Sequence, residues 1–150
     1  MSTATPTATP TSETEIRALI DSWLKAVHAQ DIAGIVSDYA PDILAFDAIA
    51  KLQFKGREAY QKHWEACLAM CPGPGIFEMH DLQIAAGEDV AFAHCLNWCG
   101  GTDANGEEKA SWMRMTAGYR KINGKWAVVH EHWSAPFDME SGKALFDLKP

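Results

Sequence analysis

The sequence lacks the features that mark several large classes of protein. Its 150 residues carry 13 Lys and Arg against 20 Asp and Glu, a formal net charge of −7, and the basic residues form no cluster. Binding to a phosphate backbone relies on clustered positive charge, so we expect no nucleic-acid partner. No apolar run approaches the roughly 18 residues that a membrane-spanning helix needs. We therefore expect no membrane partner either.

Cysteine is scarce, and its spacing is not that of common metal sites. Cys67 and Cys71 are four residues apart, as are Cys95 and Cys99, whereas zinc ribbons use tighter C-x-x-C pairs. Reduced and mostly buried thiols are the simplest interpretation. The first ten residues, Met1–Pro10, have neither the basic region nor the apolar region of a secretion signal. We predict a cytoplasmic protein without metal or other cofactor.

What the chain does contain is enough apolar sequence for one folded domain. Apolar residues make up 47% of the sequence, and six of them are tryptophans. A chain of this length buries a sizeable core. We predict a disordered tail at residues 1–12, one domain at 13–137 and a C-terminal tail at 138–150.

The first half of the chain predicts helices. Ser12–Glu15 has the pattern of a capping box, and apolar residues then recur at helical spacing as far as Val27. Asp31 is a suitable cap for a short second helix. A short strand is predicted at Ile43–Asp47. A third helix, Arg57–Met70, is bounded by Gly56 and by a Pro- and Gly-rich stretch.

The second half of the chain predicts strands. Its clearest signal is Asn123-Gly124, a pair typical of tight hairpin turns, because both positions tolerate positive φ. Four long strands are predicted at Ile76–Ala86, Val90–Cys99, Glu108–Lys121 and Trp126–Ser134. The fold class is therefore α+β. Three N-terminal helices are expected to pack on a curved antiparallel sheet and form a cone with one open end.

Side-chain alternation along three of these strands predicts which residues face the inside of the cone. The predicted inward sets are Phe92, His94, Leu96 and Trp98; Ser111, Met113, Met115, Ala117 and Tyr119; and Ala127, Val129, Glu131 and Trp133. A single β-bulge would exchange the two faces. With the faces as predicted here, His130 and His132 point outward. They have the spacing of a metal-binding pair but no third ligand in the strand, and a subunit interface is the preferred interpretation.

These segments together resemble the nuclear transport factor 2-like superfamily, which includes the SnoaL-like proteins and the ketosteroid isomerases. The resemblance covers about residues 13–137. Glu15–Trp23 and Asp31–Tyr39 are similar to the first two helices of the isomerases, and Gly124–Pro136 resembles the end of the association (hub) domain of calcium/calmodulin-dependent protein kinase. The resemblance implies the cone-shaped fold. It does not assign a reaction, because function varies widely on this fold.

The resemblance also implies roles for individual residues. Asp47 falls where the isomerases keep their general base, which moves a proton at a carbon beside a carbonyl. Trp23 and Ala117 fall where the isomerases keep their oxyanion donors, so steroid isomerisation is not expected. The arginine positions of the hub pocket correspond to His94, Ala117 and Trp133, which favours flatter and less acidic ligands.

The leading hypothesis is a pocket enzyme that uses acid–base chemistry on a small, largely apolar carbonyl- or hydroxyl-bearing metabolite. Isomerisation, dehydration and cyclisation are the expected reaction types, with Asp47 as the base and His94 as the acid or polarising donor. The expected substrate-binding residues are Trp23, Trp64, Trp98, Met113, Met115, Glu131 and Trp133.

Glu131 must be paired or neutral if it faces an apolar interior, and Arg114 or a histidine is its expected partner. A homodimer formed through the outer face of the sheet is also expected. The alternative is a non-catalytic ligand-binding or oligomeric hub module.

Overall fold

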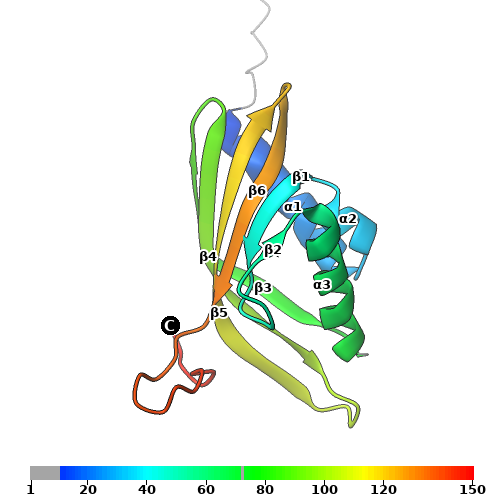
Figure 1. Cartoon of the computed structure of the whole chain (residues 1–150), viewed down its shortest axis with the longest axis vertical. Helices are drawn as coiled ribbons and strands as arrows, with labels where there is room; N and C mark the ends of the chain where they lie inside the picture. The colour runs from blue at the N-terminus through cyan, green and yellow to red at the C-terminus, as the bar shows by residue number, and fades with distance from the viewer. Residues whose placement is uncertain (1–10, 72) are drawn as a thin grey trace, which may run out of the picture.

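The structure, a computed structural model, describes residues 11–71 and 73–150, and Met1–Pro10 of the predicted tail lie outside this part. The fold is α+β, with the helices gathered on one side of a curved sheet (Figure 1). The elements are α1 (Ser12–His28), α2 (Ile32–Val36), β1 (Tyr39–Phe46), β2 (Phe54–Lys55), α3 (Arg57–Met70), β3 (Ile76–Ala86), β4 (Val90–Thr102), β5 (Glu108–Ile122) and β6 (Lys125–Ser134). The bounds of α3 and β3 are those predicted.

The six strands form one mixed sheet in the order β2-β1-β6-β5-β4-β3. β1 runs parallel to β6, and the other neighbours are antiparallel. The sheet is therefore not wholly antiparallel as predicted, because β1 joins the last strand of the chain in the same direction. The two-residue β2 was not predicted, since so short a segment carries no periodic signal.

Helix α1 begins one residue earlier than the capping box implied. Thr11 is the N-cap, and its hydroxyl accepts a hydrogen bond from the Thr14 backbone N–H at 3.2 Å, so the prediction of Ser12 as the cap is wrong. Asp31 is the N-cap of α2 as expected, but its side chain makes no capping hydrogen bond. The buried face of α1 carries Ile16, Ile20 and Trp23, which join the core against the sheet.

A β-bulge in β6 changes the face of its first residues. Gly118 of β5 lies opposite His130, whereas the next residue, Tyr119, lies opposite Val128, so Val129 is an extra residue. Before the bulge Trp126 and Val128 are buried, and the predicted inward orientation of Ala127 and Val129 is wrong. Beyond the bulge Glu131 and Trp133 point inward as predicted.

In β4 the predicted faces are exchanged along the whole strand. The buried residues are Ala91, Ala93, Cys95 and Asn97, each opposite an inward residue of β5. His94 and Phe92 are exposed, and Trp98 is half-buried beside Trp112 with ring centroids 5.3 Å apart. The predicted inward orientation of His94 and Trp98 is therefore wrong. Small residues of β4 face the large Met115 and Tyr119, and this leaves the bulky residues of β4 on the outer face.

Candidate functional site

The main pocket lies between α3 and the concave face of the sheet and has a volume of about 140 Å³. Most of its wall is apolar or aromatic. The lining residues are Asp47, Ala48, Ile49, His63, Trp64, Cys67, Phe77, Cys99, Met113 and Trp133. One acidic and one imidazole group in an apolar pocket match the composition of small-molecule sites.

Asp47 and His63 meet at one side of this pocket. The His63 Nε2–H donates to the Asp47 carboxylate at 2.7 Å, and the two side chains are only 9% and 15% exposed, respectively. The Ile49 backbone N–H also donates to the same carboxylate oxygen, at 3.2 Å. The His63 ring stacks on Phe54 with centroids 4.1 Å apart. Both groups are therefore held in fixed orientations.

Sequence reasoning placed Asp47 by resemblance but missed His63. The available signal was helical spacing. Tyr60, His63, Trp64 and Cys67 stand at positions i, i+3, i+4 and i+7 of α3 and so share one face of the helix. Three of these four residues line the pocket, and Tyr60 is fully buried beside it. A polar residue within such an inward face is a candidate site residue.

Cys67 also approaches the imidazole, but it is not arranged as a nucleophile. Its Sγ lies 3.6 Å from His63 Nε2, the nitrogen that already contacts Asp47, and 3.9 Å from Nδ1. A nucleophile–His–Asp relay needs the two partners on different ring nitrogens. Burial raises the pKa of the Cys67 thiol, and the nearby charge of Asp47 raises it further. The thiol therefore stays protonated and weakly nucleophilic.

Behind the pocket wall lies the buried carboxyl of Glu131. Its Oε1 accepts hydrogen bonds from the Trp133 Nε1–H at 3.0 Å and from the Tyr60 hydroxyl at 3.2 Å. The expected pairing with Arg114 or a histidine is wrong, because Arg114 is exposed and donates to Ser134. Loss of hydration on burial raises the pKa of Glu131 to about 7, against the lowering effect of the donated hydrogen bonds. This carboxyl therefore changes charge near neutral pH.

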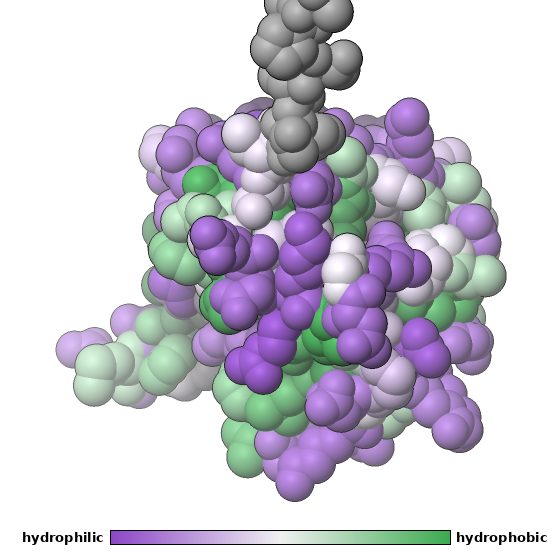
Figure 2. Space-filling model, turned by 90° about the horizontal axis from the view of Figure 1, so that it is seen from above, coloured by the Kyte–Doolittle hydropathy of each residue, from purple (hydrophilic) through white to green (hydrophobic). Residues whose placement is uncertain are grey.

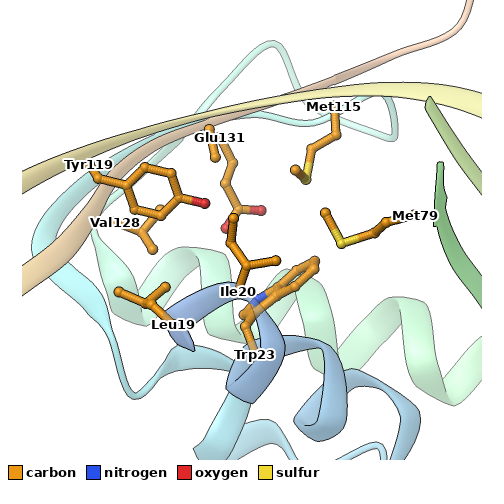
Figure 3. Close-up of a pocket in the computed structure, with 9 residues that line it drawn as sticks. Leu19, Ile20, Trp23, Met79, Met115, Tyr119, Val128 and Glu131 are labelled. Atoms are coloured by element: carbon orange, nitrogen blue, oxygen red, sulfur yellow. The ribbon is translucent and has the colours of Figure 1, made fainter. Parts of the chain in front are cut away.

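A second, smaller cavity lies on the other side of Glu131, between α1 and the sheet. Figure 3 shows Leu19, Ile20 and Trp23 of α1 facing side chains that come from three strands. Those strand residues are Met79, Met115, Ala117, Tyr119, Val128 and Glu131. Its free volume of about 10 Å³ has room for about one water molecule. This cavity is therefore not a second substrate pocket.

The structure divides the predicted site residues into three groups. Asp47, Trp64, Met113 and Trp133 line the main pocket, whereas Trp23, Met115 and Glu131 line the small cavity. The Trp23 ring stands between the two spaces, with centroids 6.0 Å from Trp64 and 6.4 Å from Trp133. His94 and Trp98 belong to neither space and lie on the outer face of the sheet.

Two buried polar groups near the pocket have no hydrogen-bond partner within the described part of the chain. They are the indole Nε1 of Trp64 and the side-chain amide of Asn97. Trp64 lines the pocket, and Asn97 lies in register with Met113, which also lines it. Buried polar groups are normally paired, so the lack of a partner at these two positions is unusual.

Residues 11–71 and 73–150 contain neither a metal-binding cluster nor a membrane-spanning helix. No three His, Cys, Asp or Glu side chains converge there as a metal site would require. His130 instead donates its Nδ1–H to the carbonyl of Leu44 at 2.6 Å. In the same ranges, no helix combines the length and the apolar character needed to cross a bilayer.

The fold and its pocket define a nuclear transport factor 2-like protein. Residues 16–138 match the SnoaL-like domain, and the chain belongs to that family. The chain is 56% identical to a nuclear transport factor 2-like protein of unknown function from Pseudomonas putida, covering 92% of this chain and 96% of that chain with a TM-score of 0.86. None of the functionally curated proteins matches the chain.

More distant structures share the fold alone. A provisionally assigned calcium/calmodulin-dependent protein kinase II association domain from Xanthomonas campestris is 24% identical, covers 91% of this chain and 97% of that chain, and gives a TM-score of 0.70. A provisionally assigned dehydratase of the nuclear transport factor 2-like family from Streptomyces avermitilis is 15% identical, covers 87% of this chain and 100% of that chain, and gives a TM-score of 0.75.

Proposed function

We propose that the protein is an enzyme that uses acid–base chemistry on a small, largely apolar molecule bearing a carbonyl or hydroxyl group. Isomerisation, dehydration and cyclisation are the reaction types that this chemistry serves. The observation that carries the proposal is the 2.7 Å contact between Asp47 and His63 at the wall of an otherwise apolar pocket. A fixed carboxylate beside an apolar binding space suits proton abstraction from carbon.

In this proposal Asp47 is the base. It takes the proton from a carbon beside the substrate carbonyl. The electron pair of the broken C–H bond forms a C=C bond to the carbonyl carbon, and the π pair of the carbonyl moves to its oxygen. That oxygen needs a hydrogen-bond donor as its charge grows. The candidate donor is the Nε1–H of Trp64, which has no partner among the described residues and belongs to a ring that lines the pocket.

His63 takes the place that sequence reasoning gave to His94. Its Nε2–H holds the Asp47 carboxylate while that group is ionised. Once Asp47 has accepted a proton, the pair formed by Asp47 and His63 keeps that proton until it returns to the substrate at another atom. An isomerase needs this return, and a dehydratase needs the proton for the departing hydroxyl.

The alternative is a non-catalytic binding or hub module, and its support is the fold shared with the Xanthomonas campestris association domain. A homodimer is compatible with either function. Its support is the outer face of the sheet, where Val90 and Phe92 are 56% and 50% exposed. Exposed apolar side chains on one sheet face favour a partner surface.

The test of catalysis is hydrogen exchange on a ketone that fits the pocket. An engineered apolar cavity of about 150 Å³ binds benzene, so cyclohexanone is a ring of suitable size. Exchange of its α-hydrogens in D2O is followed by NMR. We expect catalysis above the buffer rate, and Asp47→Asn should reduce it about 100-fold.

The matched control is Asp21→Asn, which changes an exposed aspartate on α1. Exchange by this variant should equal that of the unmodified protein. Retention of full exchange by Asp47→Asn would exclude Asp47 as the base. Absence of exchange on cyclohexanone and on the acyclic ketones described below would favour the non-catalytic module.

A further inference from the structure

The main pocket does not end at its mouth but continues into a groove of about 410 Å³. The two spaces share five lining residues, namely Ala48, Ile49, Cys99, Met113 and Trp133. The far side of the groove is formed by Ala144 and Phe146, which follow the last strand in the chain. Pocket and groove therefore adjoin each other along these residues, and we call them the inner and the outer space.

The segment that carries Phe146 has a defined shape. Residues 136–146, here called the C-terminal hairpin, leave the end of β6 and project from the sheet (Figure 1). The Leu145 N–H donates to the Pro136 carbonyl at 2.8 Å, and the Asp138 N–H donates to the Lys143 carbonyl at 2.8 Å. These hydrogen bonds close the hairpin just before Phe146 and so hold that residue at the groove.

The chemistry of the groove is apolar and uncharged. Its described lining consists of Ala48, Ile49, Cys99, Gly100, Ser111, Met113, Trp133, Ser134, Ala135, Ala144 and Phe146, none of which carries a formal charge at neutral pH. Among the described residues that line either space, the carboxyl of Asp47 and the imidazole of His63 are the only such groups, and both lie in the inner pocket. A ligand that spans both spaces thus meets the reactive groups at one end and apolar walls at the other.

The volumes decide what such a ligand looks like. The inner pocket of about 140 Å³ holds a group near the size of benzene, and a longer molecule must extend into the groove. We propose that the substrate has two parts: a compact carbonyl-bearing end beside Asp47, and a neutral apolar tail that lies in the groove against Phe146. Phe146 is then a specificity-determining residue for tail length. The carbonyl end rests on the proposed function, whereas the tail site does not.

The test uses methyl ketones of increasing length, from butan-2-one to nonan-2-one, with binding to the full chain measured by calorimetry. Each methylene that enters the groove should increase affinity about fourfold. Phe146→Ala should reduce the affinity for nonan-2-one about tenfold and leave that for butan-2-one unchanged.

Phe137→Ala is the matched control. Phe137 lies in the same hairpin and is 64% exposed, against 57% for Phe146, but it does not line the groove. Its substitution should leave the affinity for every ketone of the series unchanged. An affinity that does not rise with chain length, or equal losses in the two variants, overturns the tail site. A change of oligomeric state in Phe146→Ala without loss of ketone affinity also overturns it, because the residue would then contact a second copy.

Exchange of the α-hydrogens of butan-2-one, measured in parallel, separates the two proposals. If the α-hydrogens exchange but affinity does not rise with the chain length of the ketone, the result supports the enzyme and excludes the tail site. Length-dependent binding without exchange supports the tail site and excludes the acid–base function. Failure of every ketone to bind excludes the tail site.

Discussion

Trp133 donates its indole N–H to the carboxyl of Glu131, two residues earlier on the same strand, at 3.0 Å. The two side chains lie on the same inward face of β6, and Tyr60 of α3 donates to the same oxygen at 3.2 Å. One buried oxygen atom therefore joins a strand, a helix and a wall residue of the pocket. The charge of Glu131 is thereby coupled to the geometry of that wall.

The first prediction concerns stability and pH. The pKa of Glu131 is raised from 4.5 to about 7, so the native protein binds this proton more tightly than the unfolded chain does. Its contribution to stability is complete below pH 4.5 and is lost as pH rises through 7, a fall of the order of 3 kcal/mol. Glu131→Gln should remove this fall, as judged by urea unfolding at pH 5 and pH 8.

The control for this measurement is Glu88→Gln, which changes an exposed residue in the turn after β3. Its stability should follow that of the unmodified protein at both pH values. If Glu131→Gln also loses as much stability between pH 5 and pH 8 as the unmodified protein, Glu131 does not titrate in this window.

The second prediction separates two histidines. His63→Phe keeps an aromatic ring on Phe54 but removes the N–H that holds Asp47 at 2.7 Å. The rate at which the α-hydrogens of cyclohexanone exchange should fall about 100-fold, whereas the affinity for cyclohexanone should change little. His94→Gln, on the exposed outer face, should leave exchange unchanged. Loss of exchange in His94→Gln alone would restore the role inferred from sequence.

Much of the fold was predictable because local sequence signals show where its helices and strands begin and end. Gly56 before α3 and the Pro- and Gly-rich segment after it delimit that helix, and the predicted bounds of α3 and β3 match the structure. The family was recognisable from the same order of elements and from the last hairpin. These signals are local, which is why sequence alone carries them.

The arrangement of the site depends on contacts that no local pattern contains. Glu131 and Tyr60 are 71 positions apart in the chain, so the sequence around either residue does not predict their hydrogen bond. In β4 the bulky apolar residues face outward because register with β5 places small residues inside. His94 therefore faces outward and not inward as predicted. In β6 the extra residue Val129 exchanges the predicted inward and outward faces only before the bulge.

The third prediction tests the donor role of Trp64. Its Nε1 is buried without a partner among the described residues, and its ring lines the pocket. Trp64→Phe keeps an aromatic wall but removes the donor. Affinity for cyclohexanone should fall about fivefold, the value of one hydrogen bond. Methylenecyclohexane has nearly the same shape but no acceptor, and its affinity should not change. Equal effects on the two ligands would assign Trp64 to packing alone.

The fourth prediction concerns the buried amide of Asn97. This residue is 0% exposed, and neither side-chain polar atom has a partner in the described part of the chain. An unsatisfied buried amide costs about 1–3 kcal/mol of folding free energy, and leucine has nearly the same shape without that cost. Asn97→Leu should therefore raise the free energy of unfolding by about 1 kcal/mol or more, measured by urea denaturation.

Asn97→Ala is the comparison, because it removes the amide but also leaves a cavity and should be less stable than Asn97→Leu. If both variants are destabilised equally, the amide is satisfied in the folded protein and the prediction is wrong. Greater stability of Asn97→Leu together with weaker binding of cyclohexanone would mean that the amide is retained for the ligand. The free energy lost by burying an unpaired group would then be recovered when the ligand binds.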